Sequence, residues 1–307
     1  MKQKKAFHLT GLLLVLVLFL PGASSAEAVY RDAGAASWPF LKMDIGARAA
    51  ALGGTGLVNS GALAIFANPA LLAYQGASLT ASHNSWYGRT DQQVISALFP
   101  WGERLGASLA FRVLNTGGLE YRETPSSEPT GTFDVTDISL NAALGLRLGD
   151  SFAIGAGVKF IREKVWIEES SGLCFDMGVL STPARGLVLS AAVQNIGPGA
   201  VMVSREFRLP RTIRAAAGYT VPSPVGSLTV SAEVQKPLDN RPRGGVGLEY
   251  QPLSWVALRG GYRFNDPSST ITTGMGFSQR GWMLDYAFVP GSHTLGDTHR
   301  FTLTRAL

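Results

Sequence analysis

The sequence predicts an all-β fold, a transmembrane antiparallel β-barrel of about fourteen strands with an N-terminal hatch segment in its lumen. Three observations favour this fold. Apolar residues alternate strictly with small or polar ones along most of the chain, and the connections between alternating segments differ in length. No stretch beyond the N-terminus has the length of a membrane-spanning helix. Glycine accounts for 36 of the 307 residues, and only 16% of residues are charged.

The N-terminus has the three parts of an export signal. MKQKK is positively charged, GLLLVLVLFL is apolar, and PGASSAEA ends in an Ala-x-Ala cleavage site. This predicts a signal peptide over residues 1–28, with cleavage after Ala26 as the alternative. The apolar run is shorter than the ~20 residues that span a bilayer, which argues against an uncleaved anchor. No cysteine lies near the cleavage site, which argues against a lipoprotein. We expect the protein to leave the cytoplasm.

Alternation with a period of two predicts β-strands, because successive side chains of a strand lie on opposite faces of the sheet. Apolar residues occupy every second position of 138–148 and 152–160. The same pattern recurs over 105–113, 228–234, 256–264 and 282–288. From residue 77 onward there is about one strand for every sixteen residues, which suits transmembrane strands of ~9–11 tilted residues.

A soluble β-sandwich or a lipid-binding barrel alternates in the same way, with its apolar face inward. The opposite face, however, is rich in Gly and Ala, where a water-facing surface carries more Lys, Glu and Thr. Several apolar faces end in aromatic residues, as in the interfacial girdles of membrane barrels. Examples are Phe152, Phe160, Tyr262 and Phe264.

The connections alternate between short and long. Short ones are expected at 100–103, 149–150, 182–186 and 251–254, and longer ones at 115–131, 163–171, 197–209, 236–243 and 290–296. This asymmetry predicts a bacterial outer-membrane barrel in contact with outer-membrane lipid, with periplasmic termini and long loops outside. Closure also satisfies the backbone hydrogen bonds of the strands in lipid.

The residues before the first strand predict a plug inside the barrel. Segment 29–76 is mostly apolar or small, so its exposure to water would be costly. A barrel of this size is also wider than its own side chains fill. Inward glycines would leave room for packed backbone: Gly145, Gly155, Gly157, Gly178, Gly218, Gly247, Gly274 and Gly276. The expected organisation is a signal peptide over 1–28, a hatch over 29–76 and the barrel over 77–307.

Two local features refine the view of this hatch. Proline at position 69 moves Asn68 out of the helical region, so a turn is expected before the first strand. The glycines at 53, 54 and 56 match neither GxxxxGK[ST] nor GxGxxG and follow no predicted strand, which argues against a phosphate-binding loop.

The segment GARAAALGGTGLVNSGALAIFANPALLA, residues 46–73, resembles the N-terminal signature of the PorV/PorQ proteins, relatives of the FadL long-chain fatty acid transporters. The resemblance rests on Gly46, Ala47, Arg48, Ala49, Gly53, Gly54, Asn68, Pro69 and Ala70. LDYAFVPGSHTLGDTHRFTL near the C-terminus adds support. Where the family has an acidic pair, this chain has Asn59-Ser60-Gly61. The chain ends in Arg305-Ala306-Leu307 without a terminal aromatic residue, so Phe301 and Leu303 are left as the signal for the barrel-assembly machinery.

The resemblance implies two functions. FadL-like proteins take up hydrophobic or amphipathic molecules, such as a fatty-acid-like ligand, through a mobile hatch and a side opening in the wall. Some PorV/PorQ proteins are instead docking or scaffold components for protein secretion or surface attachment. In that case the 115–131 loop would bind secretion-system or exported proteins.

Strand parity also places charged residues in the lumen. The candidate substrate-binding cations are Arg112, Arg147, Arg214, Arg259 and Arg263, with Lys159 as a further lumen cation. Possible acidic partners are Asp176, Glu233, Glu249 and Asp285. These cations would either bind the carboxylate of an amphipathic ligand or pair with the acids and pin the hatch.

No catalytic residues, metal site or cofactor are expected. His83, His293 and His299 follow the signal, and a nucleophile–base pair on the lipid-facing side is the alternative to girdle positions for His83 and His299. Zinc-ligand spacing is lacking, and Asp239-Asn240 and Asn265-Asp266 suit loop turns better than calcium ligands. Nucleic-acid binding is not expected, because no Lys/Arg stripe with interleaved aromatics occurs. The single cysteine, Cys174, precludes an intrachain disulfide.

Overall fold

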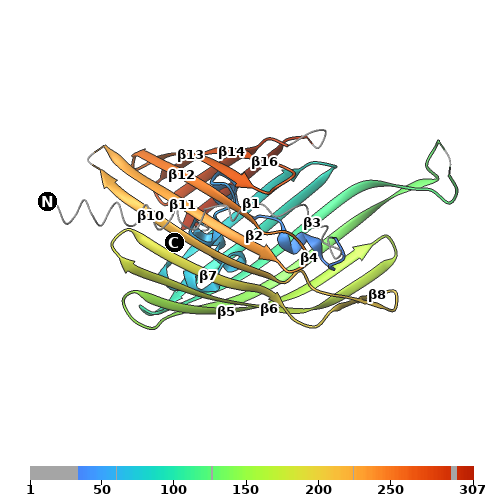
Figure 1. Cartoon of the computed structure of the whole chain (residues 1–307), viewed down its shortest axis with the longest axis horizontal. Helices are drawn as coiled ribbons and strands as arrows, with labels where there is room; N and C mark the ends of the chain where they lie inside the picture. Colours follow the sequence, from blue (N-terminus) through green and yellow to red (C-terminus); the bar gives the residue numbers. More distant parts are fainter. Residues whose placement is uncertain (1–33, 60, 126, 224, 292–295) are drawn as a thin grey trace.

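Fourteen strands close into an antiparallel barrel in the computed structural model, which describes residues 34–59, 61–125, 127–223, 225–291 and 296–307 (Figure 1). The strands follow one another in chain order, and β1 (Ser78–Trp86) closes the barrel by pairing with β16 (Thr298–Ala306). Between them lie β2 (Thr90–Trp101), β3 (Leu105–Tyr121), β4 (Gly131–Arg147), β5 (Phe152–Val165), β6 (Glu168–Ala184), β7 (Leu187–Ile196), β10 (Thr212–Ser223), β11 (Gly226–Pro237), β12 (Arg243–Leu253), β13 (Val256–Phe264), β14 (Ile271–Gln279) and β15 (Trp282–Val289). The predicted antiparallel barrel of about fourteen strands is confirmed.

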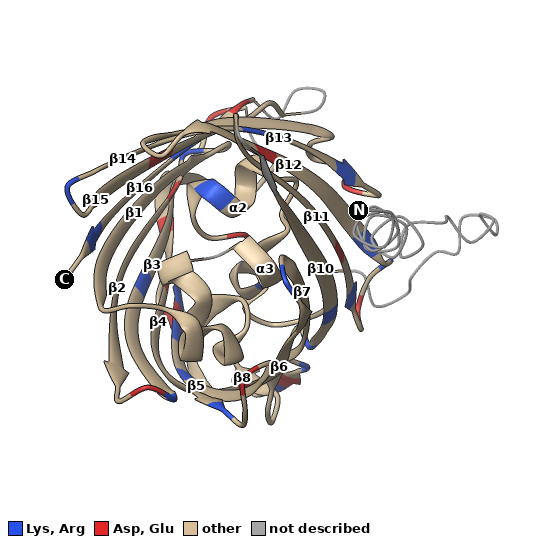
Figure 2. Cartoon of the chain, turned by 90° about the vertical axis from the view of Figure 1, so that its left-hand side faces the viewer, with Lys and Arg blue, Asp and Glu red and all other residues tan. Residues whose placement is uncertain are grey.

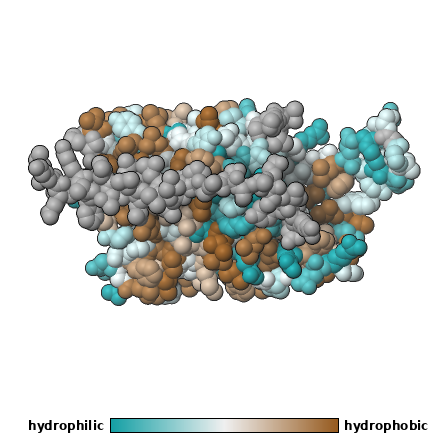
Figure 3. Space-filling view, viewed as in Figure 1, coloured by the Kyte–Doolittle hydropathy of each residue, from teal (hydrophilic) through white to brown (hydrophobic). Residues whose placement is uncertain are grey.

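The outward face of the wall is apolar. Leu109 is 56% exposed and Phe277 is 44% exposed, and brown apolar residues cover much of the barrel surface seen in Figure 3. Tyr262 and Phe264, expected in a girdle, both lie outward with their ring centroids 4.9 Å apart. A continuous apolar surface of this kind suits contact with lipid tails. None of the described helices is long and apolar enough to cross a membrane.

The two ends of the barrel differ in their connections. At the termini end, where β1 begins and β16 ends, neighbouring strands are joined by two to four residues. At the opposite end, called the loop end here, most connections are longer. The connection between β7 and β10 covers residues 197–211 and includes a small hairpin of β8 (Ala200–Met202) and β9 (Arg205–Phe207). The predicted alternation in length is therefore present in most connections.

The predicted loop 163–171 is largely strand instead, and residues 115–121 and 131 of the predicted loop 115–131 also lie in strands. β3 and β4 stay paired beyond a register shift between Thr116 and Leu119, and β5 and β6 are joined by residues 166–167 alone. Aromatic packing holds these extensions together, because the Trp166 ring lies 4.8 Å from that of Tyr121 and 6.5 Å from that of Phe133. The β3–β4 hairpin therefore projects beyond its neighbours (Figure 1).

Residues 39–74, called the lumen segment here, lie inside the ring of strands (Figure 2). The segment forms short helices: η1 (Pro39–Lys42), α2 (Ala47–Ala51), α3 (Gly56–Asn59), η2 (Gly61–Phe66) and η3 (Pro69–Tyr74). Gly53 and Gly54 have φ angles of 70° and 85°, which end the α2 turn in a conformation that suits glycine. The signal peptide predicted over 1–28 and the first residues of the predicted hatch are outside the described residues.

Candidate functional site

Wall glycines let the backbone of η3 approach β3, β4 and β5 directly. A Cβ added at Gly155 would lie 2.2 Å from the amide nitrogen of Ala70, and one added at Gly145 would lie 2.5 Å from the carbonyl oxygen of Pro69. These separations are shorter than side-chain atoms tolerate. The close approach predicted from the inward glycines therefore occurs here.

The other predicted glycines have varied surroundings. Gly247 faces Leu52, Gly274 faces Ala51, and Gly218 faces Val58, all three from the lumen segment. Gly276 instead faces Arg259 and Asp285 of the wall, and Gly157 lies closest to Ala143. Gly261, which the sequence reasoning missed, meets the amide nitrogen of Gly53 at 2.1 Å from an added Cβ.

Asn68 fastens the start of η3 to the wall. Its φ of −148° is extended, as the following proline predicts, and its Oδ1 accepts a hydrogen bond from the Ala70 amide at 2.9 Å. Its Nδ2 donates to the Val179 carbonyl at 2.9 Å and to the Ser190 hydroxyl at 2.8 Å. One side chain thus both caps a helix and joins it to β6 and β7.

Asn68→Ala is expected to loosen η3, because it leaves buried polar atoms on both sides without partners. The cost is about 1–3 kcal/mol in the free energy of unfolding. Thermal unfolding of the detergent-solubilised protein measures it. Asn115→Ala, which removes an exposed amide paired with Thr136, is the matched control and should stay within about 0.5 kcal/mol of the parent. Equal destabilisation of the two variants would contradict the anchoring role of Asn68.

A buried ionic network joins α2 to the wall. Arg48 donates from Nε and Nη2 to the two carboxylate oxygens of Glu249 at 3.0 and 2.8 Å. Arg259 contacts the same Glu249 at 2.6 Å and Asp285 at 2.6 Å. Two of the acids that strand parity placed in the lumen therefore pair with a candidate cation, and one of them also holds the lumen segment.

A second group joins α3 and η2 to β7, β10 and β11. Arg214 donates from Nε to Glu233 Oε1 at 2.7 Å, and Glu233 also accepts the Leu57 backbone N–H at 2.9 Å. Gln194 accepts from Arg214 at 3.2 Å and donates to the Phe66 carbonyl at 2.8 Å. Nearby, Lys159 pairs with Asp176 at 2.7 Å.

A third group lies toward the loop end around Asp44. Arg263 Nη2 lies 3.0 Å from Asp44 Oδ2, and Arg263 Nη1 lies 3.3 Å from Asp266 Oδ2. Arg300, fully buried, donates to the Asp44 carbonyl at 3.5 Å and lies 4.1 Å from the centre of the Trp86 ring. Burial alone would raise the pKa of Asp44, but Arg263, Arg300, Arg214 and Arg243 lower it below its ordinary value. Sequence reasoning missed both Asp44 and Arg300.

The remaining candidate cations contact neutral groups. Arg112 donates to the Phe40 carbonyl at 2.6 Å and lies 4.7 Å from the centre of the Phe40 ring. Arg147 lies over the Tyr74 ring at 4.4 Å, at the termini end of β4. The candidate cations therefore do not all meet at one site, although Arg112, Lys159 and Arg214 line a common cavity.

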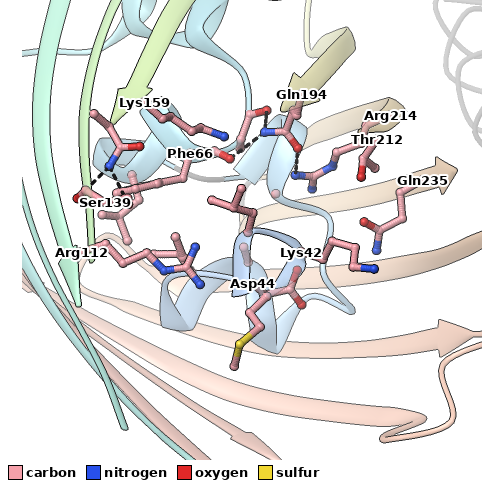
Figure 4. A pocket seen from close by; sticks show the side chains of 18 residues that line it. Lys42, Asp44, Phe66, Arg112, Ser139, Lys159, Gln194, Thr212, Arg214 and Gln235 are labelled. Atoms are coloured by element: carbon pink, nitrogen blue, oxygen red, sulfur yellow. Dashed lines mark hydrogen bonds between the residues drawn. The ribbon is translucent and has the colours of Figure 1, made fainter. Parts of the chain in front are cut away.

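Three cavities follow one another along the lumen. The loop-end cavity of about 250 Å³ is lined by Lys42, Asp44, Trp86, Arg243 and Arg263, among others. The central cavity measures about 40 Å³, and Arg112, Lys159 and Arg214 reach toward it from different strands (Figure 4). The termini-end cavity of about 230 Å³ lies against β1, β15 and β16.

Residues 42–49 separate these cavities. Lys42, Met43 and Asp44 line both the loop-end and the central cavity. Ile45, Ala49 and Leu63 line both the central and the termini-end cavity. The central cavity has room for a few water molecules, whereas the other two are large enough for a small organic molecule.

No group of three or more His, Cys, Asp or Glu side chains is arranged to hold a metal ion in the part of the chain described. His83 and His299 are exposed on the outward face, and His299 Nδ1 lies 2.9 Å from the Tyr286 hydroxyl. His293 lies outside the described residues.

No protein-family model and no curated protein sequence matches the chain. Solved structures do match its fold. The CymD monoaromatic hydrocarbon channel superposes with a TM-score of 0.64 at 11% identity, over 86% of this chain and 97% of that one. The barrel has a FadL-like fold. The Pseudomonas putida toluene transporter TodX superposes with a TM-score of 0.63 at 12% identity, over 86% of this chain and 98% of that one. A Pseudomonas aeruginosa FadL homologue superposes with a TM-score of 0.53 at 12% identity, over 85% of this chain and 98% of that one. None of the three is described as an enzyme.

Proposed function

We propose that the protein is a bacterial outer-membrane channel of the PorV/PorQ (FadL-like) type that passes hydrophobic or amphipathic small molecules through a hatch-gated barrel. The observation that carries this proposal is the lumen segment, which fills the barrel between two cavities of about 250 and 230 Å³. The proteins that share the fold include a hydrocarbon channel and a toluene transporter, which supports it. In this proposal residues 29–76 are the hatch, the termini end is periplasmic, and the loop end is extracellular.

The contacts of the candidate cations then indicate a different role for each group of them. Arg214 and Arg259 hold wall carboxylates that also bind the hatch, so their role is to keep it in place. Arg112 lines the central cavity and Arg263 the loop-end cavity, where they would meet a ligand with a polar head. Arg214 also lines the central cavity, but Glu233 holds its guanidinium. Arg147 lies on Tyr74 at the termini end, where it stabilises the end of the hatch.

A reversible lock on the hatch tests the proposal. A Cβ added at Gly218 lies 3.4 Å from the Cβ of Val58, close to the separation of about 3.8 Å in a disulfide. In a Cys174→Ser background, Val58→Cys with Gly218→Cys should form a disulfide that ties α3 to β10. Uptake of an uncharged aromatic hydrocarbon into proteoliposomes should fall at least about tenfold on oxidation and recover on reduction.

The two single-cysteine variants, oxidised in the same way, are the controls and should keep parental uptake. Uptake that is no faster than in protein-free liposomes would reject the channel function. Fast uptake that the disulfide leaves unchanged would reject gating by the hatch and keep the channel.

A second candidate is a non-transporting docking or scaffold component for protein secretion or surface attachment. The β3–β4 hairpin and the exposed apolar side chains of Trp166 (49%) and Ile167 (68%) at the loop end favour it. Its partners would be secretion-system or exported proteins. Removal of residues 122–130 should abolish co-purification of such a partner while hydrocarbon uptake is unchanged, and an unchanged partner yield would argue against this role.

A further inference from the structure

Two acidic side chains meet on the inner face of the wall, toward the loop end. Asp137 on β4 and Glu163 on β5 are directly opposite each other in the strand register, and their carboxyl groups are in contact. Asp137 is only 5% exposed, so water does little to screen one charge from the other. Like charges directly opposite each other destabilise a sheet, so this pair needs a proton or a cation between its oxygens.

The basic side chains of the barrel do not supply that cation. Neither Asp137 nor Glu163 forms an ion pair among the described residues. Arg112 on β3 acts on Asp137 from a greater distance, and its guanidinium donates to the Phe40 carbonyl at 2.6 Å. Arg162, next to Glu163 in β5, is exposed and pairs with Glu169 at 2.7 Å. The carboxyl pair is therefore left for a group that comes from outside the chain.

A hydroxyl group without a partner lies on the other side of Glu163. Ser170 on β6 is directly opposite Glu163 in the register and is only 4% exposed. Its Oγ and the Oδ1 of Asp137 are both buried without a hydrogen-bond partner. Such an atom costs free energy unless an ion or a water binds it. Asp137, Glu163 and Ser170 thus bring oxygen donors together across three neighbouring strands.

We propose that Asp137, Glu163 and Ser170 bind a calcium ion on the inner wall of the barrel. The two carboxylates supply the charged ligands, Ser170 supplies a neutral one, and the partly exposed Glu163 leaves the remaining positions open to water. Ca²⁺ takes oxygen ligands in irregular geometry, whereas Mg²⁺ demands a near-octahedral set that strands do not provide here. Two charged ligands suit a weak site, with a Kd of about 10⁻⁴–10⁻³ M.

This site goes beyond the proposed channel function. None of its three residues lines the loop-end, central or termini-end cavity. The ion would join β4, β5 and β6 to one another near the ends of β5 and β6, whatever passes through the lumen.

Trp38 provides a spectroscopic reporter of the site. Its ring packs on β6, because a Cβ added at Gly172 would lie 2.7 Å from Trp38 Cη2. Gly172 is two residues from Ser170, about 7 Å along the strand. An excited tryptophan at this range transfers energy to Tb³⁺, an ion that takes the same oxygen ligands as Ca²⁺ and is luminescent.

Terbium titration of the detergent-solubilised protein, after treatment with a chelator, tests the proposal. Tryptophan-sensitised emission should saturate, and Ca²⁺ should displace Tb³⁺ at a concentration about tenfold lower than Mg²⁺ does. Asp137→Asn and Glu163→Gln should each weaken terbium binding by about tenfold or more, because each removes one charged ligand. Glu169→Gln, which removes an exposed carboxylate of β6, is the matched control and should keep parental affinity.

Trp38→Phe separates the position of the ion from its affinity. This substitution removes an energy donor but no ligand, so terbium emission should fall while the calcium affinity, measured by titration calorimetry, stays parental. Heat-modifiable migration on gels shows whether each variant keeps its barrel. The competition between Ca²⁺ and Mg²⁺ uses the unaltered protein, so a variant that fails to fold leaves the proposal testable.

Parental terbium affinity in Asp137→Asn and Glu163→Gln, or an equal loss in Glu169→Gln, would overturn the proposal. Emission that Ca²⁺ does not displace would overturn it as well, and a proton shared by the two carboxyl groups would then account for their contact. None of these outcomes bears on hydrocarbon uptake, so failure of this site is distinguishable from failure of the channel function.

Discussion

Gly155→Leu is expected to drive the lumen segment away from the wall and to open the barrel to ions. The added Cβ would lie 2.2 Å from the Ala70 amide nitrogen and 2.3 Å from the Pro69 carbonyl carbon, both of them backbone atoms. Neither can move alone, because Asn68 and Pro69 fix the start of η3. Overpacking costs about 3 kcal/mol at such a site, which changes the ratio of docked to undocked hatch by roughly a hundredfold. Conductance across planar lipid bilayers measures the opening.

Gly260→Leu is the matched control for this experiment. Gly260 also lies within a wall strand, β13, but no atom lies within 4 Å of a Cβ added there. Its leucine would join the apolar outer surface and leave conductance at the parental value. If bilayers that contain the Gly155→Leu variant conducted no more than bilayers that contain the parent protein, the position of η3 in the lumen would not depend on its contact with β5.

The wall was predictable from the sequence because strand parity is a local property. Alternation placed Arg112, Arg259 and Arg263 on the inward face, and each is buried there. Parity could also have found Arg300, which lies between the outward His299 and Phe301. The extents of β3–β6 were missed because charged and polar residues continue those strands beyond the apolar band. Polar composition there suggested loops, although aromatic pairs keep the strands together.

The sequence could not predict which acidic residue pairs with which lumen cation. Arg48 and Glu249 are 201 positions apart, and only the way the lumen segment settles in the closed barrel brings them together. Asp44 lies in a segment with no periodicity, so no sequence signal showed which way its side chain points. The motif around Gly46 and Arg48 marked the right segment without indicating what it contacts.

Glu249→Gln is expected to release α2, because Glu249 is the shared partner of Arg48 and Arg259. The substitution leaves Asp285 as the only carboxylate paired with the buried Arg259. It also removes the only ion pair that Arg48 forms among the described residues. Breaking a buried pair costs about 3–5 kcal/mol, and the lower end applies because the Arg48 side chain is 33% exposed. Hydrogen exchange of the backbone amides of residues 49–52 should accelerate by roughly a hundredfold.

The control for this substitution is the same kind of pair on the outer surface. Arg162 and Glu169 lie 2.7 Å apart with side chains 51% and 43% exposed, so Glu169→Gln should cost less than about 1 kcal/mol and leave exchange in α2 unchanged. Arg48→Met, alone and combined with Glu249→Gln, completes a double-mutant cycle that isolates the coupling between Arg48 and Glu249. Glu249→Gln and Glu169→Gln each remove one carboxylate that is paired with arginine, so a difference between these two variants reports the burial of Glu249 and its contact with the hatch. Equal exchange rates in α2 for the two variants would mean that packing on the wall glycines alone holds this part of the lumen segment.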